Sequence, residues 1–264
     1  MKVTAPAKLT LSLRVTGVRE DGFHLLDAEM VSIDLADTLT FESGSGISVI
    51  DEVRGGLGVT GVPVGSDNLV ARALVLLRRD AAVRIVKRIP TGAGLGGGSA
   101  DAAAVLRWAG VTDVALAVGL GADVPFCVTG GRARVTGVGE RIEPLPFEDR
   151  RFVLALPPLS VDTAAVYRQW DERRARRGGR GDEGPGGNDL EGAAVEVAPI
   201  LGRWRDRLAQ VTGHRPRLAG SGSAWFVEGE PDGLGLAGHD FLVVDDQRAP
   251  LVAVRTVPSD SGGR

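Results

Sequence analysis

A run of glycines ahead of a helical pattern is the part of this chain best suited to chemistry. Five of the seven residues 92–98 are glycine, and an alanine-rich helical pattern follows directly. Glycine backbone can adopt left-handed dihedral angles and approach a ligand closely, because it has no Cβ atom. The start of a helix adds unpaired N–H groups and the positive end of the helix dipole. The pattern therefore predicts an anion site, typically one for phosphate, with a flexible linker as the alternative.

Three kinds of phosphate-binding loop can be compared with this run. The P-loop has a lysine after its last glycine, but Ser99 follows Gly98 here, which excludes that loop. The dinucleotide fingerprint G-x-G-x-x-G is present within residues 92–97. However, the strand before such a loop is almost wholly apolar, whereas this one carries three charges and ends near Pro90. A longer glycine loop that ends in serine is the remaining type.

Two charged residues elsewhere are candidates for proton-transfer chemistry. Lys8 is one of three lysines in the chain and shares the polar face of an alternating strand with Thr10. Asp123 lies between small residues at the start of an apolar segment. A carboxylate there can act as a general base, although aspartate is also a common turn former. A lysine beside it would keep it ionised and stabilise an attacking oxygen, whereas a solvated surface lysine is the alternative.

Further candidates lie in two turns. Phe23 and His24 follow the turn Asp21-Gly22. Such a pair can stack on a nucleobase and hydrogen-bond its edge, or it can simply pack into the core or lie on the surface. A second glycine turn, Gly220 to Gly222, would let backbone approach a phosphate, with a plain hairpin turn as the alternative. Lys87 is a further candidate, with a solvated position on its strand as the alternative.

Composition limits the class of protein. The 264 residues allow one large domain or two modest ones, and the net charge of −3 argues against a general nucleic-acid or membrane binder. The single cysteine, Cys127, excludes an intrachain disulfide, and no zinc-type spacing is present. Neither a signal peptide nor an apolar run of membrane-spanning length is apparent. We therefore expect a cytoplasmic protein.

Periodicity predicts the elements that must position these residues. Apolar or alternating runs predict strands at 8–15, 28–35, 38–41, 83–89, 124–128, 132–138, 152–156, 224–227, 241–244 and 251–254. Helical spacing predicts a helix capped by Asp67, a second at 99–109 and a third at 193–211. Strands 124–128 and 132–138 are expected to form a hairpin.

Other segments lack such patterns. Residues 43–65 are glycine-rich and poorly patterned, and the arginine-rich run 173–187 is predicted to be a solvated loop. Prolines and charges gather near 147–151, which predicts a domain boundary there. We therefore expect two domains, 1–148 and 149–264.

Several separated blocks resemble the GHMP small-molecule kinases. The glycine loop is similar to the phosphate loop of that family. The other blocks narrow the resemblance to the branch that phosphorylates a cytidyl diphosphate-linked methylerythritol in isoprenoid biosynthesis. The matching blocks are Pro6-Ala7-Lys8-Leu9, Asp21-Gly22-Phe23-His24, Asp67-Asn68-Leu69, the glycine loop, Gly121-Ala122-Asp123-Val124-Pro125, Asn188-Asp189-Leu190-Glu191 and Gly220-Ser221-Gly222.

The resemblance implies an α+β fold in two lobes, an N-terminal lobe like domain 2 of ribosomal protein S5 and a ferredoxin-like C-terminal lobe. It implies ATP and Mg²⁺ as cofactors, a small-molecule substrate, no nucleic-acid or membrane partner, and a monomer or homodimer. Asp123 would be the general base and Lys8 its partner. Ser99 would cap the helix, bind Mg²⁺, or do both. The implied ATP-binding residues are Asn68, Pro90, Thr91, Gly92, Ala93, Gly94, Leu95, Gly96, Gly97, Gly98, Ser99 and Ala100, and the implied substrate-binding residues are Thr10, Phe23, His24, Gly220, Ser221 and Gly222.

Some positions depart from the family pattern. Thr10 replaces a common asparagine, Ala100 replaces a common serine, and the segment 108–119 is short. Two alternatives therefore stay open beside the cytidyl-substrate kinase. One is another GHMP kinase that acts on homoserine or mevalonate, and the other is a non-catalytic nucleotide-binding homologue.

Overall fold

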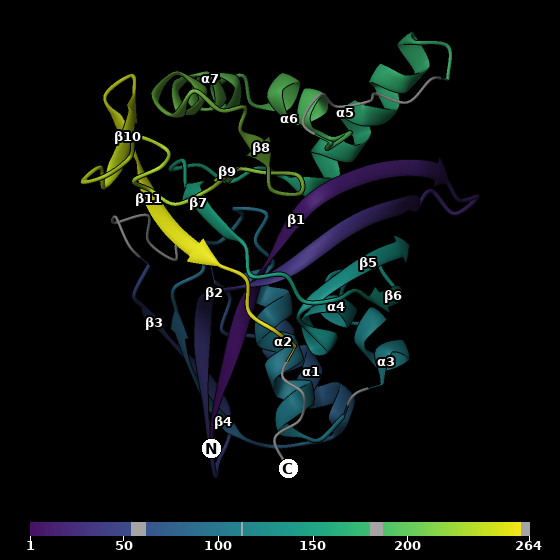
Figure 1. The fold of residues 1–264 in the computed structure, drawn as a ribbon. Coiled ribbons are helices and arrows are strands. Elements are labelled where there is room, and N and C mark those ends of the chain that lie inside the picture. Colours follow the sequence, from purple (N-terminus) through teal and green to yellow (C-terminus); the bar gives the residue numbers. More distant parts are fainter. Residues whose placement is uncertain (54–61, 112, 180–186, 260–264) are drawn as a thin grey trace.

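The computed structural model describes residues 1–53, 62–111, 113–179 and 187–259. Among them, six strands form a first sheet in the order β3-β4-β2-β5-β6, with β1 paired to β2 (Figure 1). All its pairings are antiparallel except that of β3 with β4. The strands are β1 (Lys2–Val18), β2 (His24–Glu42), β3 (Gly46–Asp51), β4 (Ala82–Lys87), β5 (Arg132–Gly137) and β6 (Arg141–Pro144).

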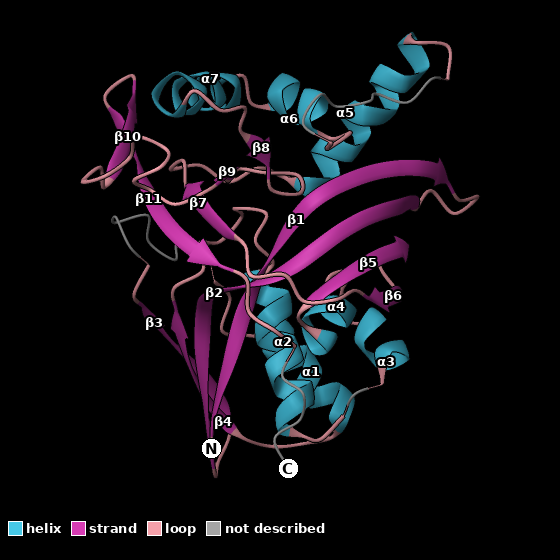
Figure 2. Cartoon of the chain, viewed as in Figure 1, coloured by secondary structure: helices cyan, strands magenta, loops and turns pink. Residues whose placement is uncertain are grey.

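Four helices of the N-terminal half lie together against this sheet (Figures 1 and 2). They are α1 (Leu69–Leu77), α2 (Gly97–Trp108), α3 (Val114–Val118) and α4 (Val124–Thr129). Helix α2 contacts β1 and β2, as well as α1 and α4. Its alanines 100 and 102–104 are fully buried, because small side chains let the helix approach its neighbours closely.

A second sheet comes from the C-terminal half, in the order β10-β11-β7-β9-β8 with every pairing antiparallel. Its strands are β7 (Arg151–Ala155), β8 (Arg217–Leu218), β9 (Trp225–Glu228), β10 (Phe241–Val244) and β11 (Gln247–Arg255). The helices of this half are α5 (Thr163–Arg176), α6 (Glu191–Val197) and α7 (Ile200–Thr212), which lie above the sheet in Figure 2. This arrangement confirms the predicted α+β class with two sheets.

The two halves are joined at several points. The chain crosses from β6 into β7 near the predicted boundary, and after β11 it returns to the first sheet, where Val257 N–H donates to the Ser32 carbonyl at 2.9 Å. Leu13 and Asn188 also form an isolated parallel bridge. We keep the division into 1–148 and 149–264 as a proposal, with the segment after β11 packing back on the first half.

Two predicted elements were wrong in type or extent. Residues 124–128 form helix α4 and not a strand, so the predicted hairpin with 132–138 does not exist. Pro125 stands at the helix start, where its missing N–H costs nothing, and a short apolar run cannot by itself distinguish a buried helix from a strand. The predicted helix 193–211 is two helices, because the chain breaks at Ala198 and Pro199.

Other predictions were incomplete. The strands 28–35 and 38–41 are parts of the single strand β2, and the unpatterned region 43–65 contains β3. Helix α5 extends into the arginine-rich run, where Arg173 and Arg176 pair with Glu196 of α6. The rest of that run includes residues 180–186, which lie outside the described residues.

Candidate active site

One cavity collects most of the predicted site residues. It has a volume of about 470 Å³ and is lined from both halves of the chain. Its lining includes Lys8, Asn68, Lys87, residues 90–99, Asp101, Asp123, Thr163, Tyr167, Gly220 and Ser221. Thr10, Phe23, His24, Ala100 and Gly222 are not part of the lining.

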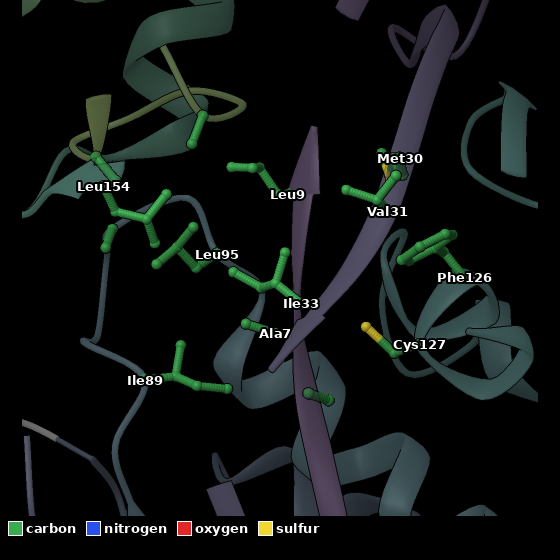
Figure 3. Close-up of a cluster of buried hydrophobic side chains, with 14 of the residues drawn as sticks. Ala7, Leu9, Met30, Val31, Ile33, Ile89, Leu95, Phe126, Cys127 and Leu154 are labelled. Carbon is green, nitrogen blue, oxygen red and sulfur yellow. The ribbon is translucent and has the colours of Figure 1, made fainter. Parts of the chain in front are cut away.

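The glycine loop is anchored at its apex by a buried leucine. Leu95 is 1 % exposed and belongs to the same apolar cluster as Leu9, Ile33 and Leu154 (Figure 3). Its carbonyl accepts a hydrogen bond from the Lys8 backbone N–H at 3.0 Å. A loop fixed by its own side chain in the core keeps its shape, which distinguishes it from the flexible linker considered above.

The second glycine turn packs directly on the first. The carbonyls of Gly92 and Ala93 accept hydrogen bonds from the backbone N–H groups of Ser223 and Ala224, at 3.3 and 3.1 Å. A Cβ atom on Gly94 would lie 2.1 Å from the Ala219 carbonyl oxygen, so only glycine fits there. The contact brings two backbone loops, far apart in sequence, to one wall of the cavity.

Asn188 fixes the second turn from outside the cavity. Its amide nitrogen donates to the carbonyls of Leu218 and Gly220, at 2.9 and 2.7 Å, and its oxygen accepts from Leu190 N–H at 2.9 Å. Nearer the cavity, the hydroxyls of Ser221 and Thr163 are 2.9 Å apart. Sequence reasoning recognised the block that contains Asn188 but did not assign it this positioning contact.

Lys8 and Asp123 form an ion pair beside the glycine loop. Lys8 Nζ lies 3.2 Å from Asp123 Oδ2 and donates to Thr10 Oγ1 at 3.3 Å. Asp123 directly precedes α4, and its side chain is 32 % exposed, so it is accessible from the cavity. A carboxylate can accept a proton, and an ammonium can stabilise a developing negative charge. The pair therefore supplies a proton acceptor and a positive charge at one point of the wall.

Ser99 lies in the first turn of α2, but it does not cap the helix. The capping residue is Gly96, in the left-handed conformation at φ 69° and without a side-chain hydrogen bond. The predicted capping role is therefore wrong, because the glycines begin the helix two residues before Ser99. Ser99 instead belongs to the cavity lining.

Oxygen donors near the loop suit a magnesium ion that arrives with a nucleotide. Ser99 and Asp123 line the same cavity, and Mg²⁺ is typically held by one or two protein oxygens together with phosphates and water. Within the described ranges, no cluster of three or more His, Cys, Asp or Glu side chains could hold a metal alone. These residues fit a metal bound mainly through the phosphates.

Asn68 caps helix α1 and also faces the cavity. Its side-chain oxygen accepts from the Val70 N–H at 2.8 Å, and its amide donates to the Pro63 carbonyl at 2.6 Å. The cap predicted at Asp67 therefore belongs to its neighbour. Because both ends of the amide are engaged, Asn68 presents a fixed edge to the cavity.

An aromatic group lies where the two halves meet. The His24 ring centroid is 4.6 Å from that of Tyr167 and 5.6 Å from that of Trp170, and His24 Nε2 lies 2.9 Å from Asp171 Oδ1. Helix α5, capped by Asp162, carries the last three of these residues. Burial raises the pKa of the Tyr167 hydroxyl, and the Asp123 charge adds to that effect.

The structure separates Phe23 from this group. The Phe23 side chain is 60 % exposed, lies under the Arg19 guanidinium and is outside the cavity lining. Sequence reasoning missed Tyr167, the single tyrosine of the chain, because no glycine-rich motif lies in its segment. Its ring contact with His24 is a tertiary contact that spacing alone does not reveal.

Lys87 is buried, which excludes the alternative of a solvated strand position. It pairs with Asp37 and Asp101, and all three side chains are buried. Burial raises the pKa of the Asp101 carboxyl to about 7, although the Lys87 charge opposes that shift.

Comparison with known proteins identifies the family. The profile described as "GHMP kinases N terminal domain" matches residues 68–131. The chain is 38 % identical over 244 residues to "4-diphosphocytidyl-2-C-methyl-D-erythritol kinase" of Cereibacter sphaeroides, covering 84 % of this chain and 87 % of that protein. This chain belongs to that kinase family. A Thermus thermophilus kinase of the same name is 40 % identical over 248 residues, covering 86 % of each chain.

Solved structures agree with this kinase family. The crystal structure of a 4-(cytidine 5'-diphospho)-2C-methyl-D-erythritol kinase is similar at a TM-score of 0.71 and 36 % identity, covering 97 % of this chain and all of that one. A mevalonate kinase from L. major shares the fold at a TM-score of 0.65 and 14 % identity, covering 98 % of this chain and 96 % of that one. The chain is therefore a small-molecule kinase with the predicted two-lobed fold. None of the helices in the described residues is long and apolar enough to cross a membrane.

Proposed function

We propose that this kinase transfers the γ-phosphate of ATP to the 2-hydroxyl of 4-diphosphocytidyl-2-C-methyl-D-erythritol, a step of isoprenoid precursor synthesis. The observation that carries the proposal is the Lys8–Asp123 pair, 3.2 Å apart, beside a glycine loop in one cavity. The identity of about 40 % with kinases of that name over most of the chain supports this substrate.

The residues of the glycine loop would bind the ATP phosphates through backbone N–H groups and the positive end of α2. Asp123 would accept the proton of the substrate hydroxyl as its oxygen attacks the γ-phosphorus. Lys8 would stabilise the developing negative charge on that oxygen. Mg²⁺, held by the phosphates near Ser99, would neutralise phosphate charge. Ala100 is buried in α2, so a hydroxyl contact to phosphate is missing at that position.

The cytidyl end of the substrate would lie near the aromatic group of β2 and α5. Tyr167 lines the cavity, and the His24 ring packs against it at a tilt, with its Nε2 paired to Asp171. The tyrosine ring can stack on a nucleobase while the imidazole of His24 hydrogen-bonds the edge of that base. Gly220 and Ser221 would contact the substrate phosphates, with Gly222 shaping the turn. The stacking role of Phe23 stays a prediction, and Thr10 would act through its hydrogen bond to Lys8.

An ADP-release assay against three alcohols tests the proposal. The purified kinase is given ATP and Mg²⁺ with the cytidyl substrate, with mevalonate or with homoserine. We expect ADP release with the cytidyl substrate alone and its loss in Asp123→Asn. Turnover of mevalonate or homoserine instead would contradict the substrate while leaving the kinase class intact. Nucleotide binding with no turnover of any alcohol would favour a non-catalytic homologue.

A further inference from the structure

A buried cluster of three charges lies behind the glycine loop. Lys87, the last residue of β4, pairs with Asp37 of β2 and, at 2.7 Å, with Asp101 of α2. The three side chains are 3 %, 0 % and 6 % exposed. Burying an ion costs several kcal/mol unless its partners compensate, so such clusters are uncommon without close geometry. The cluster also lies outside the chemistry proposed for Lys8 and Asp123.

One carboxylate of the cluster holds the segment that enters the glycine loop. Asp37 Oδ1 accepts hydrogen bonds from the backbone N–H groups of Arg88 and Ile89, at 2.5 and 2.9 Å. These are the two residues directly before Pro90, the first residue of the loop. Because both donors are backbone N–H groups, the bonds fix the path of the chain and do not depend on the side chains of Arg88 and Ile89.

The other side of the cluster holds the segment that leaves the loop. Asp101 lies in the second turn of α2, and its bond to Lys87 ties that turn to the end of β4. A Cβ atom on Gly97 would lie 3.2 Å from Lys87 Nζ, so the ammonium packs against the first residue of the helix. Lys87 and Asp101 also line the cavity. One cluster thus fixes both ends of residues 90–96.

A purely apolar cluster could serve stability equally well. Replacing a buried ion pair by packed apolar side chains is often neutral or stabilising. Hydrogen-bonded charges, in contrast, fix the distance and direction between the three elements that carry them, β2, β4 and α2. Within the described part of the chain, Asp101 Oδ1 has no hydrogen-bond partner, so the cluster is not arranged for maximal pairing. Its contacts are concentrated on the two ends of the loop.

We propose that the Asp37–Lys87–Asp101 cluster positions the glycine loop for nucleotide binding. The three residues act through the loop backbone, so they are positioning residues and not catalytic ones. The inference rests on the proposed role of the loop as the ATP site. A loop whose ends shift would misplace its N–H groups and weaken ATP binding, while the cytidyl end of the cavity, on β2 and α5, would keep its shape.

Graded variants of Asp37 test the inference. Asp37→Ala removes the carboxylate oxygen that accepts from the backbone N–H groups of Arg88 and Ile89, whereas Asp37→Asn keeps one oxygen acceptor and loses the charge. We expect Asp37→Ala to raise the KM for ATP and the Kd for ATP, measured by calorimetry without alcohol substrate, by about tenfold. Asp37→Asn and Asp101→Asn should each give smaller increases. The KM for the cytidyl substrate should stay within about twofold of the parent value.

A matched control comes from the same strand. Asp27 of β2 forms a two-bond pair with Arg134 on the surface, away from the loop. Asp27→Asn should leave both KM values unchanged. If Asp37→Ala does not fold, as judged by circular dichroism, Asp101→Asn decides the question, because that variant is nearly isosteric.

Two outcomes would overturn the inference. One is an unchanged Kd for ATP in a folded Asp37 or Asp101 variant. The other is an equal rise of both KM values, which is the expected result of general destabilisation. The calorimetric Kd needs no alcohol substrate, so it is informative even if the kinase turns out to phosphorylate a different alcohol.

Discussion

Lys8 Nζ lies 3.2 Å from Asp123 Oδ2, although β1 and the start of α4 are remote in sequence. The backbone of Lys8 is bonded to Leu95 of the glycine loop, and its side chain runs past Gly96, where a Cβ atom would lie 2.8 Å from Lys8 Cγ. Its Nζ also lies beside Gly220, where a Cβ atom would be 3.3 Å away. The absence of side chains at Gly96 and Gly220 thus leaves room for the Lys8 side chain, which ties its position to that of the loop.

The Lys8–Asp123 pair predicts that a substitution of Asp123 strongly lowers turnover and leaves nucleotide binding intact. Asp123→Asn keeps the shape of the side chain but removes the proton acceptor. General-base catalysis contributes about 10²- to 10⁴-fold, so kcat should fall by that factor. The Kd for ATP should change little, because the loop and α2 are untouched. Single-turnover phosphoryl transfer and calorimetry measure the two quantities.

Asp113 provides the matched control. It caps α3 through Ala115 N–H at 2.8 Å, outside the cavity, and like the half-buried Asp123 it directly precedes a short helix. Asp113→Asn should keep full kcat. Similar losses in both variants would mean that the effect of Asp123→Asn comes from losing a carboxylate at a helix start and not from lost chemistry.

The aromatic group predicts a selective loss of affinity for the cytidyl substrate. Tyr167→Ala removes the ring that lines the cavity and packs against His24, and base–aromatic stacking is worth about 1–3 kcal/mol per base. The KM for the cytidyl substrate should rise by about fivefold or more, with the KM for ATP unchanged. Steady-state kinetics with each substrate varied in turn gives both values.

Two further variants sharpen this prediction. His24→Ala should reproduce the effect of Tyr167→Ala, whereas His239→Ala, an exposed histidine after β9, should have none. Phe23→Ala separates the sequence-based expectation from the structural one. Because Phe23 is 60 % exposed and outside the cavity, we expect a smaller rise in KM than for Tyr167→Ala. An equal or larger rise would mean that Phe23 moves onto the substrate.

Local signals explain which parts of the site could be predicted from the sequence. The glycine loop, Lys8 and Asp123 stand in short blocks whose residue types are unusual together, and the cavity brings them together. Strands such as β10 could be predicted because the apolar residues that indicate a strand are neighbours in the sequence. Helix α4 was mistaken for a strand because six apolar-rich residues carry too little periodicity to separate the two states.

Contacts between distant segments explain the rest. The sequence left a solvated position open for Lys87, because a strand position has no sequence mark for the two carboxylates, Asp37 and Asp101, that other elements place beside it. Tyr167 and Asp171 meet His24 only because α5 lies beside the first residue of β2. Such groups depend on topology, which propensity and spacing do not determine.

The contact between the two glycine turns predicts strong sensitivity at Gly94. A Cβ atom there would lie 2.1 Å from the Ala219 carbonyl oxygen and 2.8 Å from that of Gly222, and φ is +76°. Gly94→Ala should push the turns apart and lower kcat/KM for both substrates by about tenfold or more. Gly110→Ala is the control, because it has a similar φ of +73° with nothing within 4 Å of the new Cβ. If both variants lose the same activity, backbone strain is responsible and the contact is not.

The buried position of Cys127 predicts that its thiol is unreactive. Burial raises its pKa to about 12, with the Asp123 charge adding to the effect. A raised thiol pKa favours the neutral form, so at pH 8.5 roughly one thiol in a few thousand is the reactive thiolate. We expect an aromatic disulfide reagent to label the native chain far more slowly than the chain unfolded in guanidinium. Because the chain has one cysteine, complete labelling of the unfolded chain gives the end point directly. Rapid labelling of the native protein at pH 8.5 would mean that the α4 segment opens readily beside Asp123.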